Sequence, residues 1–133
     1  MKCIDECVDC FDNDLNKLDL DVDISKVTNL IVTVIFDFFV NSLVSQKLIL
    51  GYTINPPLNS KCIHKLGSTI EKTYERNIDI NNVFNKAGVC RVIAQIILSI
   101  FSLNTKESGA LNDVGKIEAI RAASAYLESW IKK

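Results

Sequence analysis

The most apolar part of the chain runs from Gly88 to Leu103, with the sequence GVCRVIAQIILSIFSL. Its only charged residue is Arg91, and one glutamine and two serines are the other polar positions. A helix that is apolar on nearly every side is either a membrane span or the centre of a helical bundle. Sixteen residues make about 24 Å of helix, short of a hydrocarbon core of roughly 30 Å. We therefore predict a central helix over about 88–103, with other helices packed around it.

A second long apolar stretch runs from Ser25 to Leu50 and carries polar residues at every fourth position. These positions are Asn29, Thr33, Asp37 and Asn41. The spacing predicts a helix over about 25–50 that is buried on most sides and polar along one edge. A carboxylate in mid-helix argues against a membrane span. Gly51 and the two prolines after it are expected to end the helix.

Two further helices follow from spacings of three and four residues. One covers about 60–77, with an apolar face formed by Ile63, Leu66, Ile70 and Tyr74. The other covers 112–133, and its expected inward stripe is Val114, Ile117, Ile120, Ala123 or Ser124, Leu127 and Ile131. Between the helices we expect a short element that contains Val83 and Phe84, and a polar loop over 104–109. No segment alternates as a strand does, so the fold class is all-α.

Charge divides the chain into an acidic leader, residues 1–23, and a single helical domain, residues 24–133. The leader has eight acidic and two basic side chains, a local charge of −6, whereas the whole chain carries −1. Its apolar residues alternate by three and four, which predicts an amphipathic helix over about 3–18. A net charge near zero argues against nucleic acid as a partner.

The chain has five cysteines and no recognisable signal peptide, which is typical of reduced thiols in an intracellular protein. Cys3, Cys7 and Cys10 have the C-x3-C-x2-C spacing with which radical-SAM enzymes hold an iron–sulfur cluster. Those enzymes place the cysteines in a large α/β barrel, and this chain is short and helical. A cysteine-based metal or redox module stays an alternative, but we expect no cofactor and no metal.

Catalytic residues are not recognisable in the sequence. His64 is the only histidine, and no serine or cysteine has an identifiable base and orienting group. No glycine-rich phosphate loop follows a strand. We therefore expect a binding protein and not an enzyme.

Four stretches, in order, resemble motifs of the Bcl-2 family, in the compact form that some large DNA viruses encode. Residues 36–47 (FDFFVNSLVSQK), followed by a Gly-Tyr pair, are similar to its first helix. Residues 63–70 (IHKLGSTI) resemble its BH3 pattern, with Ser68 where the family has an aspartate. Residues 88–91 (GVCR) keep only the arginine of its N-W-G-R motif, and residues 130–132 (WIK) resemble its W-I-Q-D motif.

The resemblance implies a Bcl-2-like helical bundle with an apolar groove. In that family the groove binds the amphipathic BH3 helix of a pro-apoptotic partner and so inhibits apoptosis. Arg91 matches the arginine that pairs with the BH3 aspartate, and Gly88 would let the ligand backbone approach closely. The other candidate groove residues are Ile70, Tyr74, Val83, Phe84 and Ala94. The alternative for Arg91 is a surface arginine paired with Glu71 or Glu75.

A second function stays open, in which the same fold acts as an adaptor or decoy that inhibits innate immune signalling through an outer face. The exposed groove also predicts self-association into a homodimer. The chain ends at Trp130-Ile131-Lys132-Lys133, from which we expect no membrane anchor. The expected location is the host-cell cytoplasm, and association with mitochondria stays open.

Overall fold

The computed structural model describes Cys7, residues 23–46, Leu50 and residues 60–131, and in these parts the chain is all-helical. The helices are α2 (Ile24–Val40), the single turn α3 (Leu43–Ser45), α4 (Ser60–Asn77), α5 (Lys86–Ser108) and α6 (Asp113–Ile131). This confirms an all-α bundle. The predicted leader helix lies outside the described residues, except for Cys7, which is fully buried in the core.

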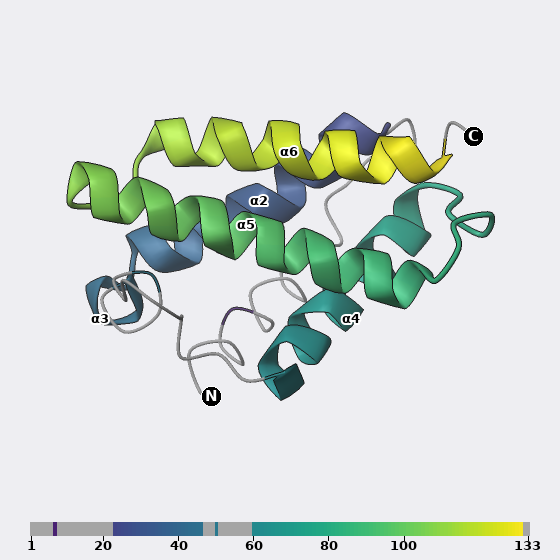
Figure 1. The fold of residues 1–133 in the computed structure, drawn as a ribbon, viewed down its shortest axis with the longest axis horizontal. Coiled ribbons are helices and arrows are strands. Elements are labelled where there is room, and N and C mark those ends of the chain that lie inside the picture. The colour runs from purple at the N-terminus through teal and green to yellow at the C-terminus, as the bar shows by residue number, and fades with distance from the viewer. Residues whose placement is uncertain (1–6, 8–22, 47–49, 51–59, 132–133) are drawn as a thin grey trace.

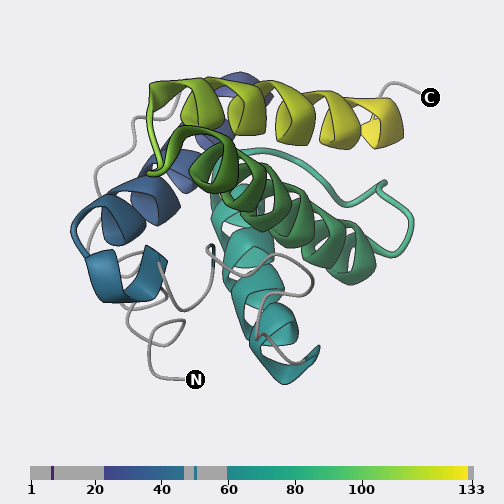
Figure 2. The same cartoon turned by 60° about the vertical axis from the view of Figure 1, so that its left-hand side comes forward.

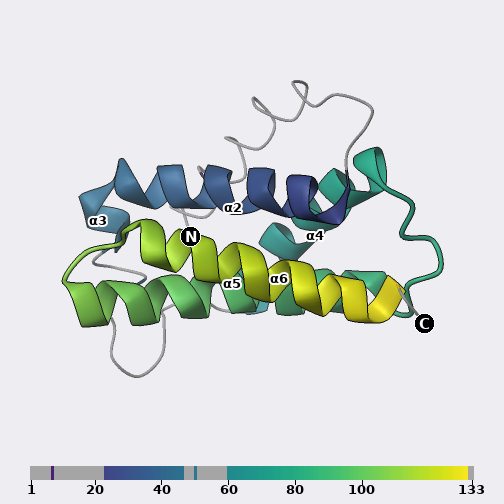
Figure 3. The ribbon, with the colours of Figure 1, turned by 90° about the horizontal axis from the view of Figure 1, so that it is seen from above.

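Helix α5 lies at the centre of the arrangement and packs against both α4 and α6. Helices α5 and α6 form an antiparallel hairpin, and α2 lies along α6 on the side away from the viewer (Figure 1). Helix α4 crosses α5 steeply (Figure 2). Seen from above, α2 and the α5–α6 hairpin form two layers (Figure 3). The largest fully buried side chains come mainly from α2, α4 and α5 and include Ile35, Leu66, Ile93 and Phe101.

Helix α2 begins where Asp23 accepts a hydrogen bond from the Lys26 backbone N–H at 2.9 Å. The predicted polar edge is confirmed, because Asn29, Asp37 and Asn41 are exposed while the opposite side is buried. The predicted end of the helix is wrong, because α2 stops at Val40 and only the turn α3 follows.

The side chain of Gln46 holds the corner after α2 against the α5–α6 turn. Its Nε2 donates to the Phe39 carbonyl at 2.8 Å, and its Oε1 accepts from the Leu111 backbone N–H at 3.3 Å. This buried amide bridge fixes the direction in which the chain leaves α2 and gives a tertiary reason for the early end of that helix.

The predicted bounds of α4 agree with the structure, and the central helix is present but longer than expected. Residues 104–108 continue α5, so the predicted loop over 104–109 is wrong. Gly109, at φ 80°, ends the helix in the left-handed conformation that glycine adopts most readily. Instead of a short element at residues 79–84, the structure has a turn, in which the Val83 N–H donates to the Ile80 carbonyl at 3.1 Å.

At its observed length, α5 spans about 35 Å, so the argument from length against a membrane span does not hold. It is the only described helix that is long and apolar enough to cross a bilayer. Half of its most apolar window is buried inside the bundle, as in the core helix of a globular protein.

The inward stripe predicted for the last helix is partly wrong. Ala123, Ser124 and Leu127 are buried as predicted, but Val114 and Ile117 are 64% and 56% exposed. The small residues Gly115 and Ala119 are buried in their place. A Cβ on Gly115 would lie 2.6 Å from Oδ1 of the Asn104 side chain. Close packing of α6 therefore selects small residues at its contact with α5.

The α5–α6 turn is closed by a pair of asparagines. Nδ2 of Asn104 donates to Oδ1 of Asn112 at 3.0 Å, and Oδ1 of Asn104 accepts from the Asn112 backbone N–H at 2.8 Å. This reciprocal pair satisfies the amide of Asn104, which is 8% exposed.

Candidate functional site

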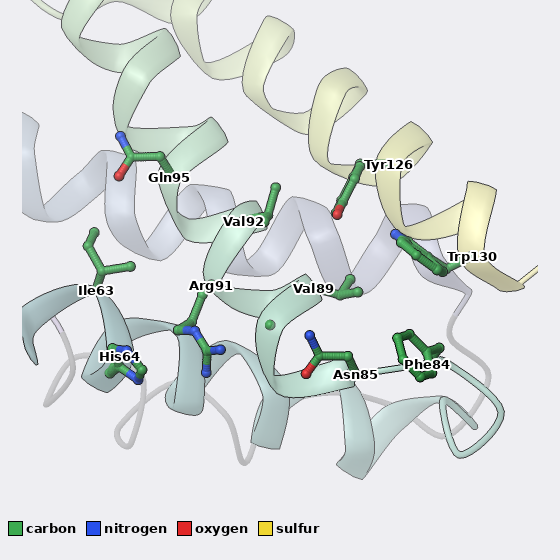
Figure 4. Close-up of a pocket in the computed structure, with 11 residues that line it drawn as sticks. Ile63, His64, Phe84, Asn85, Val89, Arg91, Val92, Gln95, Tyr126 and Trp130 are labelled. Atoms are coloured by element: carbon green, nitrogen blue, oxygen red, sulfur yellow. The ribbon is translucent and has the colours of Figure 1, made fainter. Parts of the chain in front are cut away.

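A pocket of about 670 Å³ opens between the N-terminal half of α4, the start of α5 and the C-terminal end of α6 (Figure 4). Its volume falls in the range typical of ligand sites, roughly 300–1,000 Å³. Three segments supply the lining: Ile63 and His64 from α4; Phe84, Asn85, Gly88, Val89, Arg91, Val92 and Gln95 from the start of α5 and the turn before it; and Tyr126 and Trp130 from α6. The walls are mainly apolar and aromatic, and no carboxylate is among these lining residues.

The position of Arg91 is set by the crossing of α4 and α5 at Gly67. A Cβ on Gly67 would lie 2.7 Å from Cγ of Arg91 and 3.0 Å from its Cα. Any larger residue at position 67 would push the two helices apart, because one of these contacts is to backbone. Glycine therefore allows the close approach that places the Arg91 side chain beside α4, at the edge of the pocket (Figure 4).

Arg91 is half-buried and, among the described residues, has no carboxylate within 4.0 Å. The two expected partners are engaged elsewhere: Oε1 of Glu75 lies 3.0 Å from Nζ of Lys86, and Glu71 is hydrogen-bonded to Glu75. The predicted surface ion pair between Arg91 and Glu71 or Glu75 is therefore wrong. The guanidinium remains available to an acidic group from outside.

The glutamates beside Arg91 have displaced pKa values with identifiable causes. Burial, together with the hydrogen bond and the charge of Glu75, raises the pKa of Glu71, although Lys86 and Arg91 oppose the shift. The hydrogen bond from Lys86 lowers the pKa of Glu75. Lys86 and Glu75 thus form an ion pair, whereas in the described part of the chain Arg91 acts on Glu71 through its charge and makes no ion pair within 4.0 Å.

The other end of the pocket is aromatic. The rings of Tyr126 and Trp130 meet edge to face, with centroids 6.4 Å apart and an interplanar angle of 80°. Phe84 lies on the rim and is 77% exposed, the highest value among the large hydrophobic residues in the described part. Asn85, immediately after it, has φ 51° and ψ 52°, a left-handed conformation that asparagine tolerates better than most residues.

The space above Gly88 is filled by the chain itself. A Cβ at this position would lie 2.4 Å from Nδ2 of Asn85, so the asparagine side chain folds over the glycine. A ligand backbone could approach Gly88 closely only after the Asn85 side chain had moved aside, which its exposed position allows.

Of the seven groove residues expected from the sequence, the structure places three at this pocket: Arg91, Gly88 and Phe84. The other four are core residues, with exposures of 0% for Ile70, Tyr74 and Ala94 and 7% for Val83. The Tyr74 hydroxyl is hydrogen-bonded to Thr28 at 2.5 Å, and burial raises the pKa of the tyrosine.

Sequence reasoning did not assign most of the pocket walls to the site. The residues it missed are His64, Asn85, Val89, Val92, Gln95 and Tyr126. Ile63 and Trp130 were named for other reasons but were not expected to line the pocket. A signal for part of the set was present. Gly88, Arg91, Val92 and Gln95 are spaced by three and four residues and so share a helix face. The contribution of α6 has no such local signal, because it depends on how the hairpin packs.

Neither a metal centre nor a reactive thiol is found among the described residues. No group of three or more potential metal ligands occurs there, and Cys3 and Cys10 lie outside the described parts. Cys7, Cys62 and Cys90 are buried and form no disulfide. Burial raises the pKa of Cys90 to about 12, so its thiol is neutral and unreactive near pH 7.

Comparison with known proteins gives no relative: no family model, no curated protein and no solved structure matches the chain.

Proposed function

We propose that the protein inhibits apoptosis by sequestering BH3 helices of pro-apoptotic Bcl-2 family proteins in the pocket between α4, α5 and α6. The observation that carries the proposal is Arg91, a half-buried cation that makes no ion pair with a carboxylate of the described residues, at the edge of an apolar and aromatic pocket. The motif resemblance in the sequence adds support, and it is the reason for choosing this class of ligand.

An amphipathic helix is the ligand whose chemistry fits these walls. Its apolar side chains would pack against Val89, Val92 and Trp130, and its acidic residue would pair with Arg91. Guanidinium and carboxylate groups form charge-assisted, bidentate pairs that fix orientation as well as adding affinity. In Figure 4, Arg91 lies between His64 at one end and the aromatic side chains at the other. The ligand would therefore place its acid toward α4 and its apolar residues toward α6.

The direct test is calorimetric titration of the full chain with a panel of BH3 peptides. We expect binding in the micromolar range or tighter, and Arg91→Ala should weaken it by about 1.5–3 kcal/mol, or roughly 10- to 150-fold. A peptide whose aspartate is replaced by asparagine should lose the same amount, with no further loss on Arg91→Ala. Arg121→Ala, an exposed arginine on α6 outside the pocket, is the matched control and should change nothing.

Failure of every peptide to bind at micromolar concentration would contradict the proposal. So would equal binding by the wild-type chain and Arg91→Ala, because no other basic residue of the pocket can supply the same bidentate contact. Helix content measured by circular dichroism would show that the variant remains folded.

The second candidate is an adaptor or decoy that inhibits innate immune signalling through an outer face of the bundle. The observation that favours it is the burial of Ile70, Tyr74, Val83 and Ala94, which closes part of the expected groove. Cell reporters for apoptosis and for innate signalling separate the two functions. Loss of protection from apoptosis on Arg91→Ala supports the first, whereas signalling inhibition that survives Arg91→Ala supports the second.

A further inference from the structure

The rim of the pocket carries an apolar projection next to an apolar hollow on the same face of the molecule. Phe84 projects with 77% of its surface exposed, and the hollow beside it is lined by Val89, Tyr126 and Trp130. Phe84 immediately precedes Asn85, whose left-handed backbone begins α5. Exposing a large aromatic side chain costs free energy that burial in a partner would recover.

We propose that a second copy of this chain covers the pocket, with Phe84 of each copy inserted into the pocket of the other. A two-fold axis makes the contact reciprocal, because both copies then use the same surface. Phe84 of the first copy enters the pocket of the second, and Phe84 of the second enters the pocket of the first. The hollow, at about 670 Å³, is several times larger than the roughly 150 Å³ cavity that accommodates benzene, so the ring fits.

The charge distribution favours a copy of the same chain in this arrangement. His64 lies at the far end of the pocket from Phe84 and Trp130, and Arg91 lies between them (Figure 4). An axis close to the Phe84 end would bring the uncharged aromatic parts together and keep the two basic ends apart. Like charges would therefore not face each other across the contact.

The area available sets the strength of the dimer. A stable interface of standard size buries roughly 800 Å² on each partner, and one aromatic ring with the rim of a single pocket offers only part of that. We therefore expect a weak dimer, with a dissociation constant on the order of 10–100 µM. Since the same pocket is covered, dimer formation would compete with any ligand that enters it.

Analytical ultracentrifugation of the full chain from about 5 to 500 µM tests the proposal. The wild-type mass should rise toward that of a dimer, and Phe84→Ser should raise the dissociation constant by roughly 30-fold or more, the loss expected for a buried aromatic anchor. Leu43→Ser is the matched control, because Leu43 is 68% exposed on α3 and does not line the pocket. If circular dichroism shows that Phe84→Ser has lost helix content, Phe84→Asn is used in its place.

A second measurement uses Trp130, the only tryptophan in the chain and a wall of the pocket. Its emission should shift to shorter wavelength as the wild-type concentration rises, but not in Phe84→Ser. A monomeric wild-type chain at every concentration would overturn the proposal, as would a dimer unaffected by Phe84→Ser or one lost equally in Leu43→Ser. The Arg91 titrations, made below 5 µM protein, remain a separate test of ligand binding.

Discussion

The hydroxyl pair between Thr28 and Tyr74 joins α2 to α4, and it allows a quantitative test of the packing between these helices. Both residues are fully buried, and their oxygens lie 2.5 Å apart. Thr28→Val or Tyr74→Phe removes one hydroxyl and leaves the other in an apolar environment. Each single variant should lose about 1–3 kcal/mol of unfolding free energy, because the remaining buried hydroxyl has lost its partner.

The double variant should lose less than the two single losses added together. With both hydroxyls absent, no polar group is left unsatisfied, so the coupling between the sites should be at least about 1 kcal/mol. Urea unfolding monitored by circular dichroism at pH 7 measures all four corners of the cycle. A loss of 1 kcal/mol corresponds to a fall of roughly 3–5 °C in Tm for a chain of this size.

Additive losses would refute the reasoning, since they would mean that the two hydroxyls do not depend on each other. Single losses below about 0.5 kcal/mol would refute it as well, because each hydroxyl would then have another partner or reach water. The coupling must also disappear in a control cycle that pairs Tyr74→Phe with Ser129→Ala, an exposed position on α6.

Three further predictions concern the α4–α5 crossing and the start of α5. Gly67→Ala should lower the unfolding free energy by about 1–3 kcal/mol despite the higher helix propensity of alanine, because its Cβ meets the Arg91 backbone; urea unfolding would show this, with the exposed Ser68→Ala as control. Burial raises the pKa of Cys90 to about 12, so the folded protein keeps this thiol protonated where the unfolded chain loses the proton. The contribution of Cys90 to the free energy of unfolding is therefore complete below pH 9 and falls as the pH rises above it. Urea unfolding should show a loss of about 1 kcal/mol between pH 9 and 10 that is absent in Cys90→Ala. Asn85→Ala should lower the free energy of unfolding by about 1–2 kcal/mol, which a fall in Tm would show, because alanine disfavours the left-handed backbone. Asn85→Gly should not lower it, because glycine adopts this conformation readily.

Periodicity alone was enough to predict the helices, because each one buries a continuous stripe of side chains. It also located the ends of α4, where no tertiary contact overrides the local pattern. It failed at Val40 and at Asn104. In both places a buried amide decides the outcome: Gln46 holds the corner after α2, and Asn112 satisfies Asn104 inside a continuing helix. These partners are 7 to 65 residues away and have no local sequence signal.

The candidate site was predictable to the extent that it lies on one helix. Arg91 and Gly88 belong to the start of α5, and the motif resemblance pointed to them directly. The walls supplied by α4 and α6 depend on close helix packing at Gly67 and Gly115, where small residues decide which larger side chains remain at the surface. A spacing of three and four residues fitted to the large apolar side chains therefore placed Ile117 in the interior, whereas Ala119 is buried and Ile117 is exposed.

The asparagine pair that closes the α5–α6 turn joins residues only eight positions apart. A loop this short loses little entropy on closing, so the hairpin can form early during folding. Helix α2, by contrast, packs against α6, from which α3, α4 and α5 separate it along the chain. The apolar side of α2 is therefore covered only once α6 is present, so this long-range contact is expected to form later than the hairpin.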